Sequence, residues 1–352
     1  MEIEFTNDKK VKLSTKQYIQ STIEELEESL AAYKENLNKE YSCPAGRWLF
    51  KLKEDEKPIT EDKADLYRSF VAKLLWIMKR SRPDLELAVS FLSTRVKAPT
   101  KSDWHKFLRV MCWLKQTKLD VRVIGADDLV NMVVMIDSAH AVHDNMRGHT
   151  GGVTSFGTGI IDQKSSKQKM NTRSSTETEH VGTSEYLPKP IFLELFMGAQ
   201  GYSPNMVLCK DNESEIRMLL NGKASCTSNS KHVDIKYFWS TDRIRNGSIN
   251  VKHCPTDKMI ADFMSKPVQG KLFNVFREVI MGWKHISVLF DALTPAEERV
   301  GNNGVLTAGA KKPKMTKLTY AEVAKVSKAV EVQNAQIGGD ETLTERCITP
   351  PH

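Results

Sequence analysis

The sequence predicts a mixed α/β protein that begins with a mostly helical region. Between residues 15 and 115, apolar side chains recur three or four positions apart, as they do along one face of a helix. From Asn131 the pattern changes to an apolar run, NMVVMID, and then to glycine-punctuated segments that alternate like hairpin strands. Farther along, short apolar strands alternate with helical stretches. This order predicts one sheet with antiparallel and parallel strands, packed against helices.

Composition excludes several classes of protein. The 352 residues carry 51 basic against 44 acidic side chains, a net charge of +7 that is spread thinly along the chain. No apolar run reaches the roughly 18 residues needed to span a bilayer, and the start, MEIEFTNDKK, has no secretory apolar core. The six cysteines stand singly, which argues against a zinc ribbon or a disulfide framework. We therefore expect an intracellular protein with no membrane partner.

The helical region divides into four expected helices. The first covers residues 15–39, and two more, within residues 66–96, are interrupted by Pro83. The fourth runs over residues 102–115, with Ser102-Asp103 as its expected cap.

The later elements follow in an alternating order. After a three-stranded meander that begins at Asn131, we expect helices over 176–185, 189–200, 212–220, 233–245 and 256–264, and strands over 205–211 and 248–253. Beyond about Leu293 the periodicity is lost, and the tail is expected to be mostly disordered.

Four acidic residues lie where an α/β sheet gathers its chemistry. Asp137 ends the first apolar strand and Asp211 ends the strand MVLCKD, while Glu179 and Asp262 lie on helices that could reach the same edge. Carboxylates brought together repel one another unless cations neutralise them. Mg²⁺, with Mn²⁺ as the alternative, suits such oxygen ligands, and two ions about 4 Å apart can hydrolyse a phosphodiester.

Many motifs in this order resemble the C-terminal part of the polyprotein of copia-type LTR retrotransposons, where a reverse transcriptase precedes a ribonuclease H. The resemblance covers roughly residues 1 to 283. It rests on LYRSFVAKLLWIMKRSRPDLELAVSFLSTR, PTKSDWHKFLRVMCWLKQTK, DSAHAVHDNMRGHTGGVTSFGTG, SSKQKMNTRSSTETEHV, LCKDNESEI and SKHVDIKYFWSTDRIRNGSINVKHCPTDKMIADFMSKPVQG.

The resemblance implies a ribonuclease H-like sheet and a two-metal nuclease that cuts RNA in RNA:DNA hybrids. The family's acidic quartet falls on Asp137, Glu179, Asp211 and Asp262, with Glu177 as a shifted competitor for Glu179. Asp137 and Asp211 are expected to bind both ions, Glu179 the ion on the leaving-group side, and Asp262 the ion that activates water. Such a protein acts in a cytoplasmic particle or the nucleus, and an intact retroelement reverse transcriptase is a further candidate partner.

The resemblance also implies a domain division and two departures. Residues 1–129 resemble the thumb and connection of a reverse transcriptase, 130–270 the ribonuclease H, and 271–352 a C-terminal helix and tail. The polymerase palm would precede residue 1, and Asp127-Asp128 is not its metal motif, so no reverse transcription is expected. His180 follows Glu179 where the family has an aromatic or aliphatic residue. A catalytically inactive remnant that only binds nucleic acid is the alternative function.

Other polar residues have structural and functional interpretations. His140, His143 and His149 could suggest zinc, but without a nearby cysteine we expect surface or hairpin histidines. Ser174, Ser175 and Thr176 precede Glu179 and suit a helix cap. Four residues are candidate substrate contacts: Ser175, Thr176, Lys231 and His253.

Overall fold

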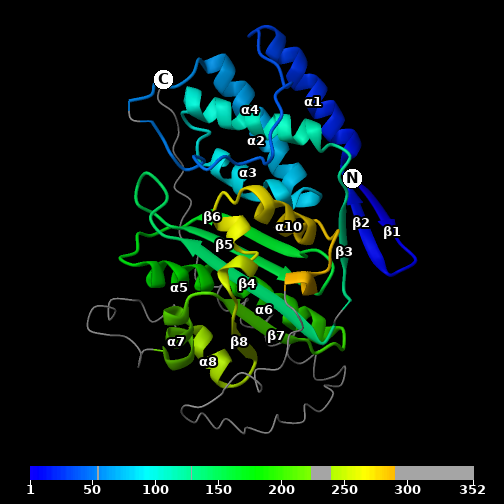
Figure 1. Ribbon diagram of the computed structural model, residues 1–352, viewed down its shortest axis with the longest axis vertical. Helices are drawn as coiled ribbons and strands as arrows, with labels where there is room; N and C mark the ends of the chain where they lie inside the picture. Colours follow the sequence, from blue (N-terminus) through cyan, green and yellow to red (C-terminus); the bar gives the residue numbers. More distant parts are fainter. Residues whose placement is uncertain (54, 128, 223–238, 290–352) are drawn as a thin grey trace, which may run out of the picture. The chain divides into compact units, whose positions relative to one another are not determined.

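The computed structural model describes residues 1–53, 55–127, 129–222 and 239–289 (Figure 1). Met1–Leu293 form one compact unit. The divisions expected at residues 129/130 and 270/271 therefore stay predictions about the sequence. The expected tail, the start of the helix over 233–245, and Lys231 lie outside the described residues.

A five-stranded mixed sheet forms the centre of this unit, which confirms the expected α/β class. The strand order is β6-β5-β4-β7-β8, with β4, β5 and β6 antiparallel and β4, β7 and β8 parallel. The strands are β4 (Asn131–Ala139), β5 (His149–Ser155), β6 (Asp162–Lys167), β7 (Asn205–Lys210) and β8 (Ile249–His253).

Alternation along β4 divides the core between the two faces of the sheet. Val133 and Met135 join one cluster with the N-terminal helices and the last helices. Met132, Val134 and Ile136 join a second cluster with the helices that follow the meander. Successive side chains of a strand point to opposite faces, so the apolar run at the start of β4 contributes to the core on both faces of the sheet.

The N-terminal helices occupy the first of these faces. They are α1 (Lys16–Ala31), α2 (Glu61–Arg80) and α3 (Glu86–Ser93), separated from α2 by a turn at Pro83, and α4 (Lys101–Gln116). The first helix ends eight residues earlier than expected, and Lys34 adopts a left-handed φ of 54° just after it. The cap of α4 is Thr100 in a capping box with Asp103, not Ser102.

Three strands in this region were not expected. β1 (Glu2–Phe5), β2 (Lys10–Ser14) and β3 (Arg122–Gly125) form a small antiparallel sheet. All of β1 is exposed and β2 is half-buried, so their sequences lack the apolar runs that mark a buried strand. The third strand of the small sheet, β3, lies more than 100 residues after β2 in the chain, and local periodicity cannot predict such a pairing.

Among the described residues, the helices on the opposite face are α5 (Ser175–Tyr186), α6 (Pro188–Ala199), α7 (Glu213–Asn221) and α8 (Trp239–Arg245). The helix expected over 256–264 is instead a 3-10 turn, Thr256–Lys258, and a short helix α9 (Asp262–Ser265), followed by α10 (Gly270–Ile280). None of the described helices combines the length and hydropathy that crossing a bilayer requires.

Candidate metal centre

Three aspartates meet at one edge of the sheet, and we call them the aspartate cluster: Asp137, Asp211 and Asp262. One carboxylate oxygen from each lies within 4.8 Å of the others. Met135 of β4 pairs in parallel with Cys209 of β7, so two residues farther along Asp137 and Asp211 lie side by side. Among the described residues, no other set of three or more His, Cys, Asp or Glu side chains lies close enough together to hold a metal ion.

A glycine allows α9 to bring Asp262 to this edge. Gly151 of β5 pairs with Asp137. A Cβ atom at Gly151 would lie 2.6 Å from the backbone oxygen of Ala261 and 2.9 Å from the backbone nitrogen of Ser265. Only glycine therefore lets the α9 backbone lie so close to the strand.

Residues of α9 and its C-terminal end also bind Asp137. The Ser265 hydroxyl donates to Asp137 Oδ2. Lys266 Nζ lies 3.2 Å from Asp137 Oδ1 and 3.0 Å from Asp262 Oδ1. One ammonium group is thus shared between two of the three aspartates.

The two buried aspartates differ in charge state. Burial would raise the pKa of Asp137, but the Lys266 ammonium and the Ser265 hydroxyl outweigh burial and lower that pKa. Burial and the neighbouring negative charge of Asp137 raise the pKa of Asp262 to about 7. Of the two, Asp137 therefore favours the charged form more strongly, and Asp262 is the carboxyl that protonates more easily.

Glu179 lies beside the aspartate cluster but is held by other partners. Its Oε1 accepts the Ser138 backbone N–H at 3.2 Å, and its Oε2 lies 2.8 Å from Lys210 Nζ. Burial and the negative charges of nearby carboxylates raise the pKa of Glu179 well above its usual range, although Lys210 opposes them. Glu177, the shifted competitor, accepts the Arg173 backbone N–H at the start of α5 instead.

A second group, the inner lysine cluster, consists of Lys210, Glu179, Glu215 and Thr183. Lys210 Nζ contacts Glu215 Oε2 at 2.6 Å and the Ile136 carbonyl at 2.8 Å. The Thr183 hydroxyl donates to Glu215 Oε1 at 2.5 Å. Burial alone would lower the pKa of Lys210, but the two carboxylates raise it.

The sequence analysis missed this inner cluster, although a signal for it was present. Strand alternation puts Lys210 on the same face as Met206 and Leu208, both of which are core residues. A lysine in such a position needs a buried acid, and Glu215 in the first turn of α7 supplies it.

A hollow of about 530 Å³ opens at Asp137 and Asp211 of the aspartate cluster, and we call it the aspartate hollow. Its lining includes Asp137, Ser138, Ala139, His140, Val142, Ser175, Glu179, Asp211, Asn212 and Lys266. Ser175 thus lies at the hollow, whereas Thr176 and His253 are not part of this lining. His253 is exposed at the end of β8, opposite Lys210.

The expectation of surface or hairpin histidines holds, because His143 and His149 belong to the hairpin of β4 and β5. His143 and His149 are buried, with His143 Nε2 3.0 Å from His149 Nδ1, and His149 Nε2 lies 2.7 Å from the Ser165 hydroxyl. Phe50 packs against both rings, so the pair joins the N-terminal region to the sheet. His140 is exposed.

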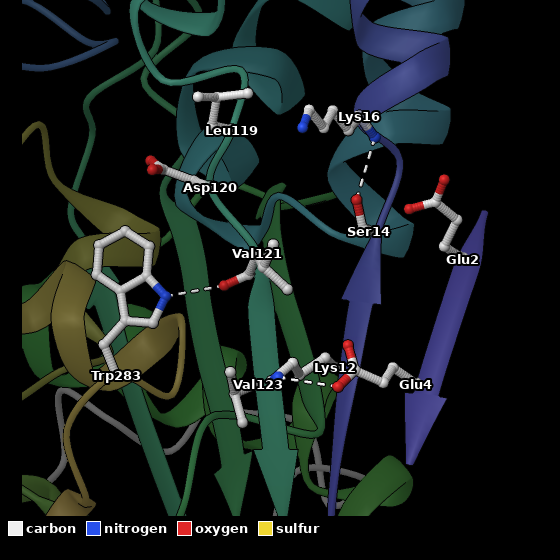
Figure 2. Close-up of a pocket in the computed structure, with 10 residues that line it drawn as sticks. All are labelled: Glu2, Glu4, Lys12, Ser14, Lys16, Leu119, Asp120, Val121, Val123 and Trp283. Carbon is white, nitrogen blue, oxygen red and sulfur yellow. Dashed lines mark hydrogen bonds and ion pairs between the residues drawn. The ribbon is translucent and has the colours of Figure 1, made fainter. Parts of the chain in front are cut away.

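Another hollow lies on the small sheet, away from these acids (Figure 2). Its lining mixes Glu2 and Glu4 with Lys12 and Lys16, and Trp283 closes one side by donating to the Val121 carbonyl at 2.8 Å. Lys12 and Glu4 form an ion pair here at 3.0 Å. This hollow shows no group of acids suited to a cation.

The aspartate cluster has the donors that a hard divalent cation prefers. Its three ligand atoms are carboxylate oxygens, and two of the three aspartates are buried, which makes an uncompensated charge costly. Open lining beside the cluster leaves room for waters, which Mg²⁺ usually retains. The residues present therefore fit a divalent cation.

Comparison with known proteins identifies relatives. The Pol polyprotein of transposon TNT 1-94 from Nicotiana tabacum is 27% identical over 279 residues, 77% of this chain and 20% of the polyprotein. Those of transposons RE2 and RE1 from Arabidopsis thaliana are 28% and 26% identical over 218 residues, 61% of this chain and 15% of each polyprotein.

The chain thus spans a fifth or less of the length of these relatives. No family model matches the chain, and no solved structure matches it significantly. The expected resemblance is nevertheless confirmed over most of the chain: it is homologous to a segment of the Pol polyproteins of copia-type retrotransposons.

Proposed function

We propose that this protein is a ribonuclease H with a ribonuclease H-like sheet, which hydrolyses the RNA strand of RNA:DNA hybrids with divalent metal ions. The observation that carries the proposal is the meeting of Asp137, Asp211 and Asp262 within 4.8 Å, with Glu179 beside them. These acids come from four separate segments, in the order that the resemblance implies. Homology to Pol polyproteins supports nucleic acid as the substrate class.

The residues of the site divide the work between binding and orientation. Asp137, Asp211 and Asp262 would hold Mg²⁺ or Mn²⁺, with Glu179 completing the set through Oε1. Two such ions, when bound, activate a water and stabilise the leaving oxygen. Water then forms a new bond to phosphorus as the bond to the 3′ oxygen breaks, which leaves a 3′-hydroxyl and a 5′-phosphate.

The test is a cleavage assay on the full chain with a labelled RNA:DNA hybrid. We expect cutting of the RNA strand that requires Mg²⁺ or Mn²⁺ and falls to background in Asp137→Asn and Asp211→Asn. Asp257→Asn, which removes an exposed acid near Asp262, is the matched control and should retain activity. Cleavage that survives either cluster substitution would refute the assignment.

The inner lysine cluster favours one other candidate function, nucleic-acid binding without cleavage. Lys210 occupies Glu179 Oε2 at 2.8 Å and so reduces the charge that Glu179 can offer a metal ion. Binding of the hybrid with no metal-dependent cutting in the same assay would favour this candidate.

A further inference from the structure

Lys266 contacts two of the three carboxylates that a cation bound by the aspartate cluster would use. Its ammonium contacts Asp137 Oδ1 at 3.2 Å and Asp262 Oδ1 at 3.0 Å. A divalent ion binds carboxylate oxygens at about 2.0 to 2.6 Å. An ion on these two residues would therefore be a close neighbour of the ammonium, and the two positive charges would repel each other.

The side chain of Lys266 is partly exposed, and its backbone is anchored at the end of α9. The Lys266 N–H donates to the Asp262 carbonyl at 2.8 Å, which anchors the residue at the end of α9. The side chain is 42% exposed, whereas that of Lys210 is 0% exposed. Lys266 can therefore leave its carboxylates for solvent, but Lys210 cannot.

A displaced Lys266 would remain in the aspartate hollow. Among the described residues that line this hollow, Lys266 is the one lysine or arginine side chain. The other charged lining residues are Asp137, Glu179 and Asp211. A nucleic-acid backbone entering an acidic hollow is repelled by those carboxylates. Lysine is a common point-charge partner for phosphate.

We propose that Lys266 is a displaceable cation of this site. In the metal-free protein it neutralises Asp137 and Asp262; when a divalent ion binds, Lys266 yields the carboxylates and contacts a backbone phosphate of the nucleic acid. The inference rests on the proposed function, because it assumes that the aspartate cluster binds metal. Lys266 would thus weaken the binding of metal ions and strengthen the binding of nucleic acid.

Lys266→Gln in the full chain tests both effects. Calorimetric titration with Mn²⁺ alone should show affinity about tenfold higher than in the wild type, because the competing charge is gone. Fluorescence anisotropy with a labelled RNA:DNA hybrid in saturating Ca²⁺, with the strand checked for integrity, should show binding about three- to tenfold weaker, because a phosphate contact is lost.

Two further variants separate charge from folding. Lys266→Arg keeps the charge and should stay within about twofold of the wild type in both titrations. Lys271→Gln removes the same charge from an exposed position five residues away and should change neither measurement appreciably. Circular dichroism confirms that each variant is folded.

The outcomes distinguish this inference from the proposed function. Unchanged or weaker Mn²⁺ binding in Lys266→Gln would overturn the displaceable cation, and unchanged hybrid binding would overturn the phosphate contact. If the wild type binds no Mn²⁺, or binds it equally well after Asp137→Asn, the proposed metal site itself fails.

Discussion

Two lysines serve neighbouring carboxylates at one edge of the sheet, yet their surroundings differ. Lys210, on the face covered by α5 and α7, is fully buried between Glu179 and Glu215. Lys266, at the end of α9, reaches Asp137 and Asp262 from the solvent side. A buried ion pair is costly to break, whereas an exposed one exchanges easily with solvent. The inner lysine therefore suits a structural role, and the outer one suits exchange with ligands.

The largest expected effect breaks the inner lysine cluster. Lys210→Met leaves Glu179 and Glu215 without their cation, which should lower the free energy of unfolding by about 3 to 5 kcal/mol. Lys266→Gln should lower it by less than Lys210→Met does, because the Lys266 side chain is 42% exposed whereas that of Lys210 is fully buried. Urea denaturation measures both.

A double variant supplies the control for Lys210. Lys210→Met with Glu215→Gln removes one charge of each sign and should recover at least half of the loss. If the two single lysine variants were equally destabilised, the contrast between inner and outer lysine would be wrong.

The buried histidine pair extends the comparison to a neutral polar cluster. Burial lowers the pKa of His143 to about 4 and holds that of His149 well below its usual range. The unfolded chain therefore takes up protons first as the pH falls below about 6.5. The contribution of His143 to the free energy of unfolding should be fully present above that pH. It should fall by about 3 kcal/mol between pH 6.5 and 4.

The measurement is urea denaturation across this pH range. His143→Phe, which fits among Phe50 and Phe91, should flatten the slope that the histidine contributes. His140→Ala, at an exposed position, should leave the slope as in the wild type. A slope that His143→Phe does not reduce would contradict the prediction.

Adjacent glycines distinguish the two faces of the sheet. A methyl group at Gly151 meets the α9 backbone, whereas one at Gly152 meets the ring of Tyr186 on the other face. Both alanine variants should lose about 1 to 3 kcal/mol through overpacking. Only Gly151→Ala should also weaken Mn²⁺ binding, because it displaces Asp262, and equal metal affinity in the two variants would argue against that.

The smallest effects concern hydroxyls that bind the aspartates. Ser265→Ala removes a buried donor to Asp137 and should cost about 1 kcal/mol. Thr256 donates to Asp211 at 3.2 Å from an exposed position, so Thr256→Val should stay within about 0.5 kcal/mol. Thermal denaturation of both variants measures the two losses of stability. A larger loss of stability for Thr256→Val than for Ser265→Ala would contradict the expected order.

Local sequence patterns predicted much of the fold. Helical periodicity identified the four N-terminal helices, and the apolar run ending in Asp137 identified the central strand, because burial imposes a period on neighbouring residues. The small sheet of β1, β2 and β3 was missed, since exposed strands carry a weak pattern and β3 joins from a distant segment.

By itself the sequence indicated which elements carry the four acids. Only the tertiary structure decided their partners. Lys266 forms ion pairs with Asp137 and Asp262, and Lys210 forms an ion pair with Glu179. The physical reason is that partner choice depends on which face of the sheet a side chain enters and on how closely α9 approaches the strand. Strand register sets the first, and the packing of α9 on β4 and β5, which lie more than 100 residues earlier in the chain, sets the second.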